Sequence, residues 1–207
     1  MEQVDHLPTR EELPAGYRQT AEFSLRNNTR MMVILNLVGF GLFIVAAGLL
    51  PRFIYLVRPQ DIGIVLSFEV DNLGQLAIFL LSIILDFVLL VILHEGVHGL
   101  CFRLITGKKP IFALGPGYAY AAAPDVYITK IPYLITAVSP LVVLTAVGLA
   151  VIPVLPRDLL FHASLIIVMN IAGAVGDLWV VGGLLLKSRT LLVRDSGDCV
   201  TVYQPSD

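Results

Sequence analysis

Charged side chains are scarce in this chain. Only 14% of its 207 residues are Asp, Glu, Lys or Arg, whereas 57% are hydrophobic, and the mean hydropathy is +0.83. A soluble domain of this length carries about a quarter charged residues. The composition therefore excludes an ordinary soluble domain, and the net charge of −2 gives no indication of a nucleic-acid partner.

Cysteine is scarce too. Cys101 and Cys199 are the two present, and two residues do not make a disulfide framework, so we expect free thiols. The N-terminal arm before residue 31 lacks the apolar core of a cleavable signal peptide. We therefore expect the first apolar block to serve as an uncleaved membrane anchor.

Long hydrophobic runs, by contrast, are abundant. They predict four transmembrane helices, at residues 31–50, 73–105, 131–155 and 159–186. Each run reaches the ~20 residues that a helix needs to cross a ~30 Å hydrocarbon layer. With their short connections these runs account for the whole chain, which predicts a single integral membrane domain over residues 1–207.

The polar connections have the composition of short strands. Residues 110–130 place aromatic and β-branched side chains around the turn Gly115-Pro116-Gly117, and residues 190–203 do so around Asp195 to Asp198. Each segment predicts a β-hairpin, and residues 17–25 predict one further strand. The expected fold class is an all-α membrane protein with short cytoplasmic hairpins.

The orientation in the membrane follows from the basic residues. Eleven of the fourteen Lys and Arg residues fall in the N-terminal arm, the connection between the second and third spans, and the tail. The other two connections hold only Arg52, Arg58 and Arg157. The positive-inside rule therefore predicts a multi-pass protein with both termini in the cytoplasm.

The second span contains the motif His94-Glu95-Gly96-Val97-His98. Four residues on a helix separate the two imidazoles by about 40° in azimuth and one turn in height, so both face the same way. Two ring nitrogens can then bind one Zn²⁺, with Glu95 beside them as a base. Polar residues can also merely hold membrane helices together, but three ionisable groups within five residues are a costly means of doing so.

A third ligand can be chosen by its depth in the membrane. His94 and His98 lie shortly before Arg103, and Asp177 lies ten residues before Lys187, so all three belong to the inner half of the bilayer. Asp86 and His162 are nearer the outer face. We expect Asp86 to be an interhelical polar contact and His162 an interfacial residue.

Other residues of the last two spans have weaker assignments. Asn170 lies on the same helical face as Asp177, where it either orients a substrate carbonyl or bonds a backbone group. Gly173 and Gly176 are expected to permit close approach of the helix that carries the histidines. Pro140 is expected to kink the third span.

These motifs together resemble a known family. The segment HEGVHGL, the basic turn and hairpin that follow it, Ser139-Pro140, and the stretch from Asn170 to Asp177 are similar to the putative zincin peptidase family of small bacterial and archaeal membrane proteins. The ends LPAGY and VRDSGDCVTVY resemble it as well. More distantly, the arrangement is similar to the site-2 proteases, although Asn170 is followed by Ile171 where those enzymes have proline. The resemblance implies zinc bound by His94, His98 and Asp177, with Glu95 as the base.

The leading prediction is a zinc-dependent peptidase of the prokaryotic cell membrane. Metal-activated water would hydrolyse a membrane protein or peptide at the cytoplasmic side of the bilayer, and the edge of the hairpin at residues 110–130 either binds that substrate or only caps the helices. Two alternatives remain: a non-catalytic membrane protein whose structural metal supports a regulatory or partner-binding role, and an ion or proton relay through the buried acids and histidines. The oligomeric state is left open.

Overall fold

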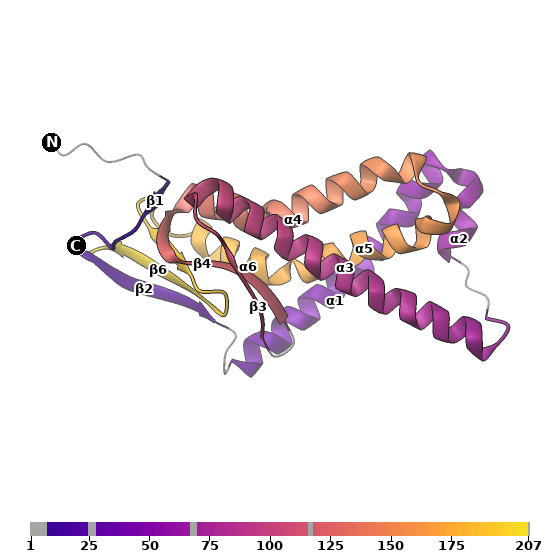
Figure 1. The fold of residues 1–207 in the computed structure, drawn as a ribbon, viewed down its shortest axis with the longest axis horizontal. Helices are drawn as coiled ribbons and strands as arrows, with labels where there is room; N and C mark the ends of the chain where they lie inside the picture. Colours follow the sequence, from indigo (N-terminus) through magenta and orange to yellow (C-terminus); the bar gives the residue numbers. More distant parts are fainter. Residues whose placement is uncertain (1–7, 25–27, 67–69, 116–117, 207) are drawn as a thin grey trace. The chain divides into compact units, whose positions relative to one another are not determined.

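The computed structural model describes residues 8–24, 28–66, 70–115 and 118–206. Four of its helical segments are long and apolar enough to cross a membrane, as the sequence predicts. They are formed by α1 (Thr29–Val57), α3 (Leu73–Thr106), α4 (Lys130–Val151), and the successive pair α5 (Leu160–Gly173) and α6 (Val175–Leu185) (Figure 1). A short helix α2 (Ile62–Leu66) joins the first two spans.

The last span differs from the single helix expected over residues 159–186. Helix α5 ends at Gly173 and α6 begins at Val175, with Ala174 between them. The ψ angle of Ala174 is 2°, far from the helical value of about −42°. This break places Asp177 in the first turn of a new helix, where the partial positive charge of the helix N-terminus favours a carboxylate.

The strands form one antiparallel sheet of six members. They are β1 (Thr9–Arg10), β2 (Tyr17–Ser24), β3 (Ile111–Gly115), β4 (Tyr118–Thr129), β5 (Leu192–Asp195) and β6 (Cys199–Pro205). Their order is β1-β4-β5-β6-β2, and β3 pairs with β4 beside this path. The hairpins expected at residues 110–130 and 190–203 and the strand expected at 17–25 are confirmed as β3–β4, β5–β6 and β2. The turn residues Pro116 and Gly117 lie outside the described residues.

The sheet corrects the expectation of an all-α protein with two separate hairpins. Strand β2 precedes α1, β3 and β4 lie between α3 and α4, and β5 and β6 follow α6, yet all belong to one sheet. Hydrogen-bonded neighbours cannot lie on opposite faces of a bilayer. In a membrane, these three parts of the chain therefore share one side; that this side is cytoplasmic stays a prediction.

The chain forms two compact units. One, the sheet unit, contains residues 1–33, 95–139 and 176–207, and the other, the helical unit, contains residues 34–94 and 140–175. In the sheet unit, Ile128, Val193 and Val202 are fully buried. In the helical unit, Ile54 and Leu160 are fully buried. Both cysteines are free thiols, as expected.

Asp86 and His162 pair with each other inside the helical unit. Asp86 Oδ2 lies 2.7 Å from His162 Nδ1, which joins α3 to α5. The predicted interhelical role of Asp86 is thus confirmed. The sequence identified both residues as structural but did not predict that they are partners.

Tyr133 and Asp195 form a buried polar contact inside the sheet unit. The Tyr133 hydroxyl donates to Asp195 Oδ2 at 2.6 Å, and the backbone N–H of Gly197 donates to Asp195 Oδ1 at 2.8 Å. Burial raises the pKa of the Asp195 carboxyl above its ordinary value, and the hydrogen bonds from Tyr133 and Gly197 offset part of that rise. The contact ties the β5–β6 turn to the start of α4.

We expect Tyr133→Phe to lower the free energy of unfolding by ~1–3 kcal/mol, because a buried carboxylate oxygen loses its donor. A raised folded pKa means that the stability contributed by Asp195 is present at low pH and lost as pH rises through that pKa. The ionised carboxyl needs the donor most, so the cost of the substitution should be larger above this pKa than below it. Unfolding in detergent across a pH series measures this, with the exposed Tyr118→Phe as the control; equal costs for both variants would contradict the role of the contact.

Candidate metal centre

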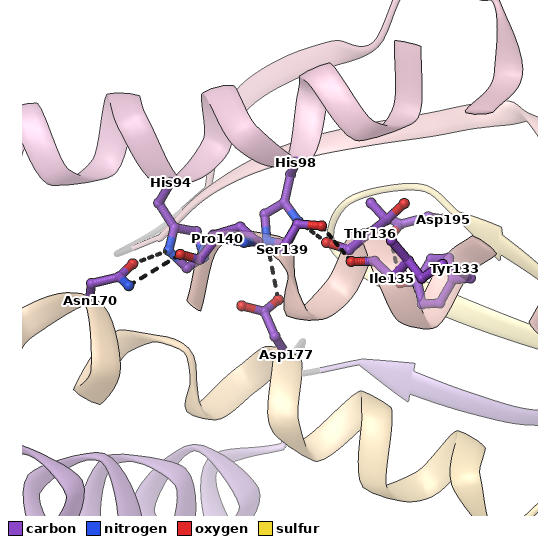
Figure 2. A network of polar contacts seen from close by, with 10 residues as sticks. All are labelled: His94, His98, Tyr133, Ile135, Thr136, Ser139, Pro140, Asn170, Asp177 and Asp195. Carbon is purple, nitrogen blue, oxygen red and sulfur yellow. Dashed lines mark hydrogen bonds and ion pairs between the residues drawn. The ribbon is translucent and has the colours of Figure 1, made fainter. Parts of the chain in front are cut away.

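Helix α3 carries His94, Glu95 and His98 without interruption. It runs from Leu73 to Thr106, so the i, i+4 spacing places both imidazoles on one face, one turn apart (Figure 2). The boundary between the two compact units falls within this helix, between His94 and Glu95. His98 is buried, while His94 and Glu95 are half-buried.

Asp177 faces His98 within the sheet unit. Its Oδ1 lies 3.4 Å from His98 Nε2, and the two side chains are 25% and 11% exposed. In a tetrahedral site with metal–ligand distances near 2.1 Å, two ligand atoms are about 3.4 Å apart. The observed separation is compatible with a shared zinc ion.

The three predicted ligands meet as one group. Donor atoms of His94, His98 and Asp177 all lie within 4.8 Å of one another. Two imidazole nitrogens and one carboxylate oxygen are the donors that zinc takes in catalytic sites, where the fourth position stays open for water or substrate. The chemistry of these residues fits zinc.

The Nδ1 atom of each histidine lies within hydrogen-bond distance of an oxygen. His98 Nδ1 lies 3.1 Å from the backbone carbonyl of Thr136, and His94 Nδ1 lies 3.1 Å from Oδ1 of Asn170 (Figure 2). Because these oxygens only accept hydrogen bonds, Nδ1 must carry the proton in both rings. In the neutral ring the lone pair is then on Nε2, the nitrogen available to a metal. Thr136 was not among the predicted site residues, since it contributes a backbone carbonyl.

Asn170 lies on α5 and is 1% exposed. Its Nδ2 donates to the carbonyl of Pro140 at 3.2 Å and lies 3.2 Å from Thr145 Oγ1. The sequence left open whether Asn170 orients a substrate or bonds a backbone group, and the backbone bond is present. Its predicted role in substrate binding stays a prediction.

The glycines near the site differ from expectation. A Cβ at Gly173 or Gly176 would meet no atom within 4 Å, so the prediction of close helix approach at these positions is wrong. The close contact involves Gly99, next to His98, where a Cβ would lie 2.2 Å from the ring of Phe112 on β3. The glycine lets β3 pack against α3 beside the histidine. A glycine within a helix permits a close approach, but the sequence does not say which glycine is approached or by what.

A family model described as "Putative zincin peptidase" matches residues 87–191. The chain belongs to this family. The matched segment includes all of the predicted site residues, which are His94, Glu95, His98, Asn170 and Asp177. No curated protein and no solved structure matches the chain. Membership in a zincin family agrees with the donor set, since zincins are named for the zinc they bind.

We expect the purified protein to bind zinc and His98→Ala and Asp177→Ala to bind it far more weakly. The loss of a ligand should weaken binding by more than the ~10–100-fold that follows the loss of an outer hydrogen bond. Asp86→Asn is the control, because Asp86 pairs with His162. Zinc content after dialysis against a chelator gives the result; equal content in wild type and both ligand variants would exclude the site.

Proposed function

We propose that this member of the family is a zinc-dependent peptidase acting within or beside the membrane. The observation that carries the proposal is the meeting of His94, His98 and Asp177 within 4.8 Å, on helices apolar enough to span a bilayer. Three ionisable ligands in such helices are costly to retain for packing alone. Three ligands also leave room for water and substrate, as hydrolysis requires.

In this mechanism, His94 and His98 would hold the zinc through nitrogen and Asp177 would hold it through oxygen. Zinc bound there would supply a Lewis acid for water and for the peptide carbonyl. Glu95 accepts the proton of the attacking water and delivers it to the amine of the departing peptide. Glu95 follows His94 directly in the motif, and its half-buried side chain is accessible to water, which supports its assignment as the base.

The substrate is a membrane protein or a peptide presented at the cytoplasmic side of the bilayer. The basic residues support that orientation. The order of the motif, His-Glu-x-x-His followed by an aspartate in a later span, resembles that of the site-2 proteases and favours the same reaction class. A peptide bond inside a helix is shielded by its own hydrogen bonds, so the scissile segment must be extended when it is cut.

Strand β3 offers an edge for such an extended segment. Among the described strands it pairs only with β4, and its residues Ile111, Phe112 and Leu114 are 48%, 56% and 84% exposed. The contact of Phe112 with Gly99 keeps this strand next to His98. A substrate added as a further strand would run beside the motif helix.

The principal alternative is a structural metal that joins helices in a non-catalytic membrane protein. Structural zinc is usually closed by four protein ligands. Within the described parts of the chain, three candidate ligands come together. This favours the catalytic function.

We expect Glu95→Gln to bind zinc like wild type and to lose cleavage, because the amide preserves shape but cannot accept a proton. Removal of a general base typically costs ~10²–10⁴-fold in rate. Digestion of casein in detergent, followed by mass spectrometry of the new termini, measures this, with Glu22→Gln on β2 as the control. Equal cleavage by wild type and Glu95→Gln would refute the mechanism.

Proline at two successive positions of β3 tests the strand edge. Neighbouring N–H groups of a strand point to opposite edges, so of Ala113→Pro and Leu114→Pro one removes a bond to β4 and the other removes an outward N–H. We expect the variant that loses the bond to β4 to be less stable. We expect the variant that loses the outward N–H to have a higher KM for casein with little change in kcat. Leu114→Ala controls for the side chain, and unchanged KM in both proline variants would exclude this edge as the substrate site.

A further inference from the structure

Pro140 interrupts the hydrogen bonding of α4 at a defined point. It lies inside the helix, which runs from Lys130 to Val151. In an α-helix the N–H of residue 140 would donate to the carbonyl of Thr136, but proline has no N–H, and its ring crowds that carbonyl. The Thr136 carbonyl is therefore deprived of its helical donor.

His98 supplies the missing donor. Its Nδ1 lies 3.1 Å from the Thr136 carbonyl oxygen, and Thr136 is 1% exposed, so water is poorly placed to serve instead. A buried carbonyl without a donor is costly, which favours a ring whose Nδ1–H points at Thr136. The opposite nitrogen, Nε2, then faces Asp177 at 3.4 Å.

The same turn also orients the second histidine through Asn170. The carbonyl of Pro140 accepts a hydrogen bond from Asn170 Nδ2 at 3.2 Å, and the side chain of Thr145 gives this nitrogen a second acceptor at 3.2 Å. With Nδ2 fixed by two acceptors, Oδ1 must face His94 Nδ1, 3.1 Å away. Figure 2 shows this chain from Pro140 through Asn170 to His94.

We propose that Pro140 and Asn170 are positioning residues that set the ring orientation of the two metal-binding histidines. Pro140 acts on His98 by leaving the Thr136 carbonyl without its helical donor, and Asn170 acts on His94 through its amide oxygen. The inference that these ring orientations affect zinc binding rests on the proposed function. The hydrogen bonds themselves do not, because they join residues of the chain to one another.

Pro140→Ala separates this role from a structural one. Restoring the N–H at position 140 should leave the midpoint of thermal unfolding in detergent unchanged or raise it, because proline disfavours a helix interior. Zinc affinity, measured by competition with a chelator, should nevertheless fall ~10–100-fold. Pro51→Ala is the matched control, since Pro51 also lies inside a helix, α1, which carries none of the site residues. The proposal for Pro140 is overturned if Pro140→Ala binds zinc like wild type, or if its affinity falls only together with its unfolding midpoint.

Asn170 is tested by a pair of variants. Asn170→Leu removes the acceptor for His94 and should weaken zinc binding ~10–100-fold, whereas Asn170→Asp keeps an acceptor oxygen and should restore most of that affinity. Wild-type affinity in Asn170→Leu, or an equal loss in both variants, would overturn the role of Asn170.

The metal-free protein provides the second readout. In ¹⁵N-histidine spectra of wild type, we expect a hydrogen-bonded proton on Nδ1 of both His94 and His98. Pro140→Ala should alter His98 alone and Asn170→Leu should alter His94 alone, while a general displacement of α4 would alter both. Absence of the Nδ1 protons in wild type would overturn the proposal even if zinc binds. If the Nδ1 protons are present but the protein cleaves no substrate, the positioning roles of Pro140 and Asn170 stand and the proposed peptidase function is refuted.

Discussion

A polar atom inside an apolar helix must find a partner, and this constraint decides how the spans of the protein are arranged. Leaving such an atom unpaired in hydrocarbon costs several kcal/mol. Among the described residues, no buried side-chain nitrogen or oxygen lacks a hydrogen-bond partner. Asp86 is paired with His162, His94 with Asn170, and His98 with the Thr136 carbonyl. In each motif histidine the Nδ1 atom has an oxygen partner, which favours Nε2 as the atom that would bind a metal.

In the proposed centre, four helices have different roles, and α5 contributes Asn170, which contacts His94. Helix α3 would supply two ligands and the base, and α6 would supply the third ligand from its first turn. Helix α4 supplies no ligand, but its backbone carbonyls at Thr136 and Pro140 hold the groups that orient the histidines. In a helix with complete internal hydrogen bonding, the carbonyl of Thr136 would already have a donor, so nothing would favour a further bond from His98.

The sequence predicts the spans, the motif and the third ligand because each depends on local chemistry or on depth. Apolar runs predict the helices, and the four-residue spacing places His94 and His98 on one helical face. The distance of Asp177 from the basic flank predicts that it lies at the same membrane depth as the two histidines, in agreement with its contact with His98, whereas Asp86 is predicted to lie at a different depth. The joining of the strands into one sheet could not be predicted, since pairing between distant segments has no local signal. The break at Ala174 was missed because the apolar pattern continues across it. The role of Thr136 was also missed, although a proline four residues later was the available signal.

The pairing of β2 with β6 has a consequence for how the protein is made. Strand β2 leaves the ribosome before the first span, whereas β6 follows the last, and the two are hydrogen-bonded from Tyr17 opposite Pro205 to Ser24 opposite Cys199. The edge of β2 that pairs with β6 therefore has no access to this partner until every span has been translated. A chain cut short before β6 would leave that edge of β2 unpaired, and an unpaired strand edge is prone to pair with other chains.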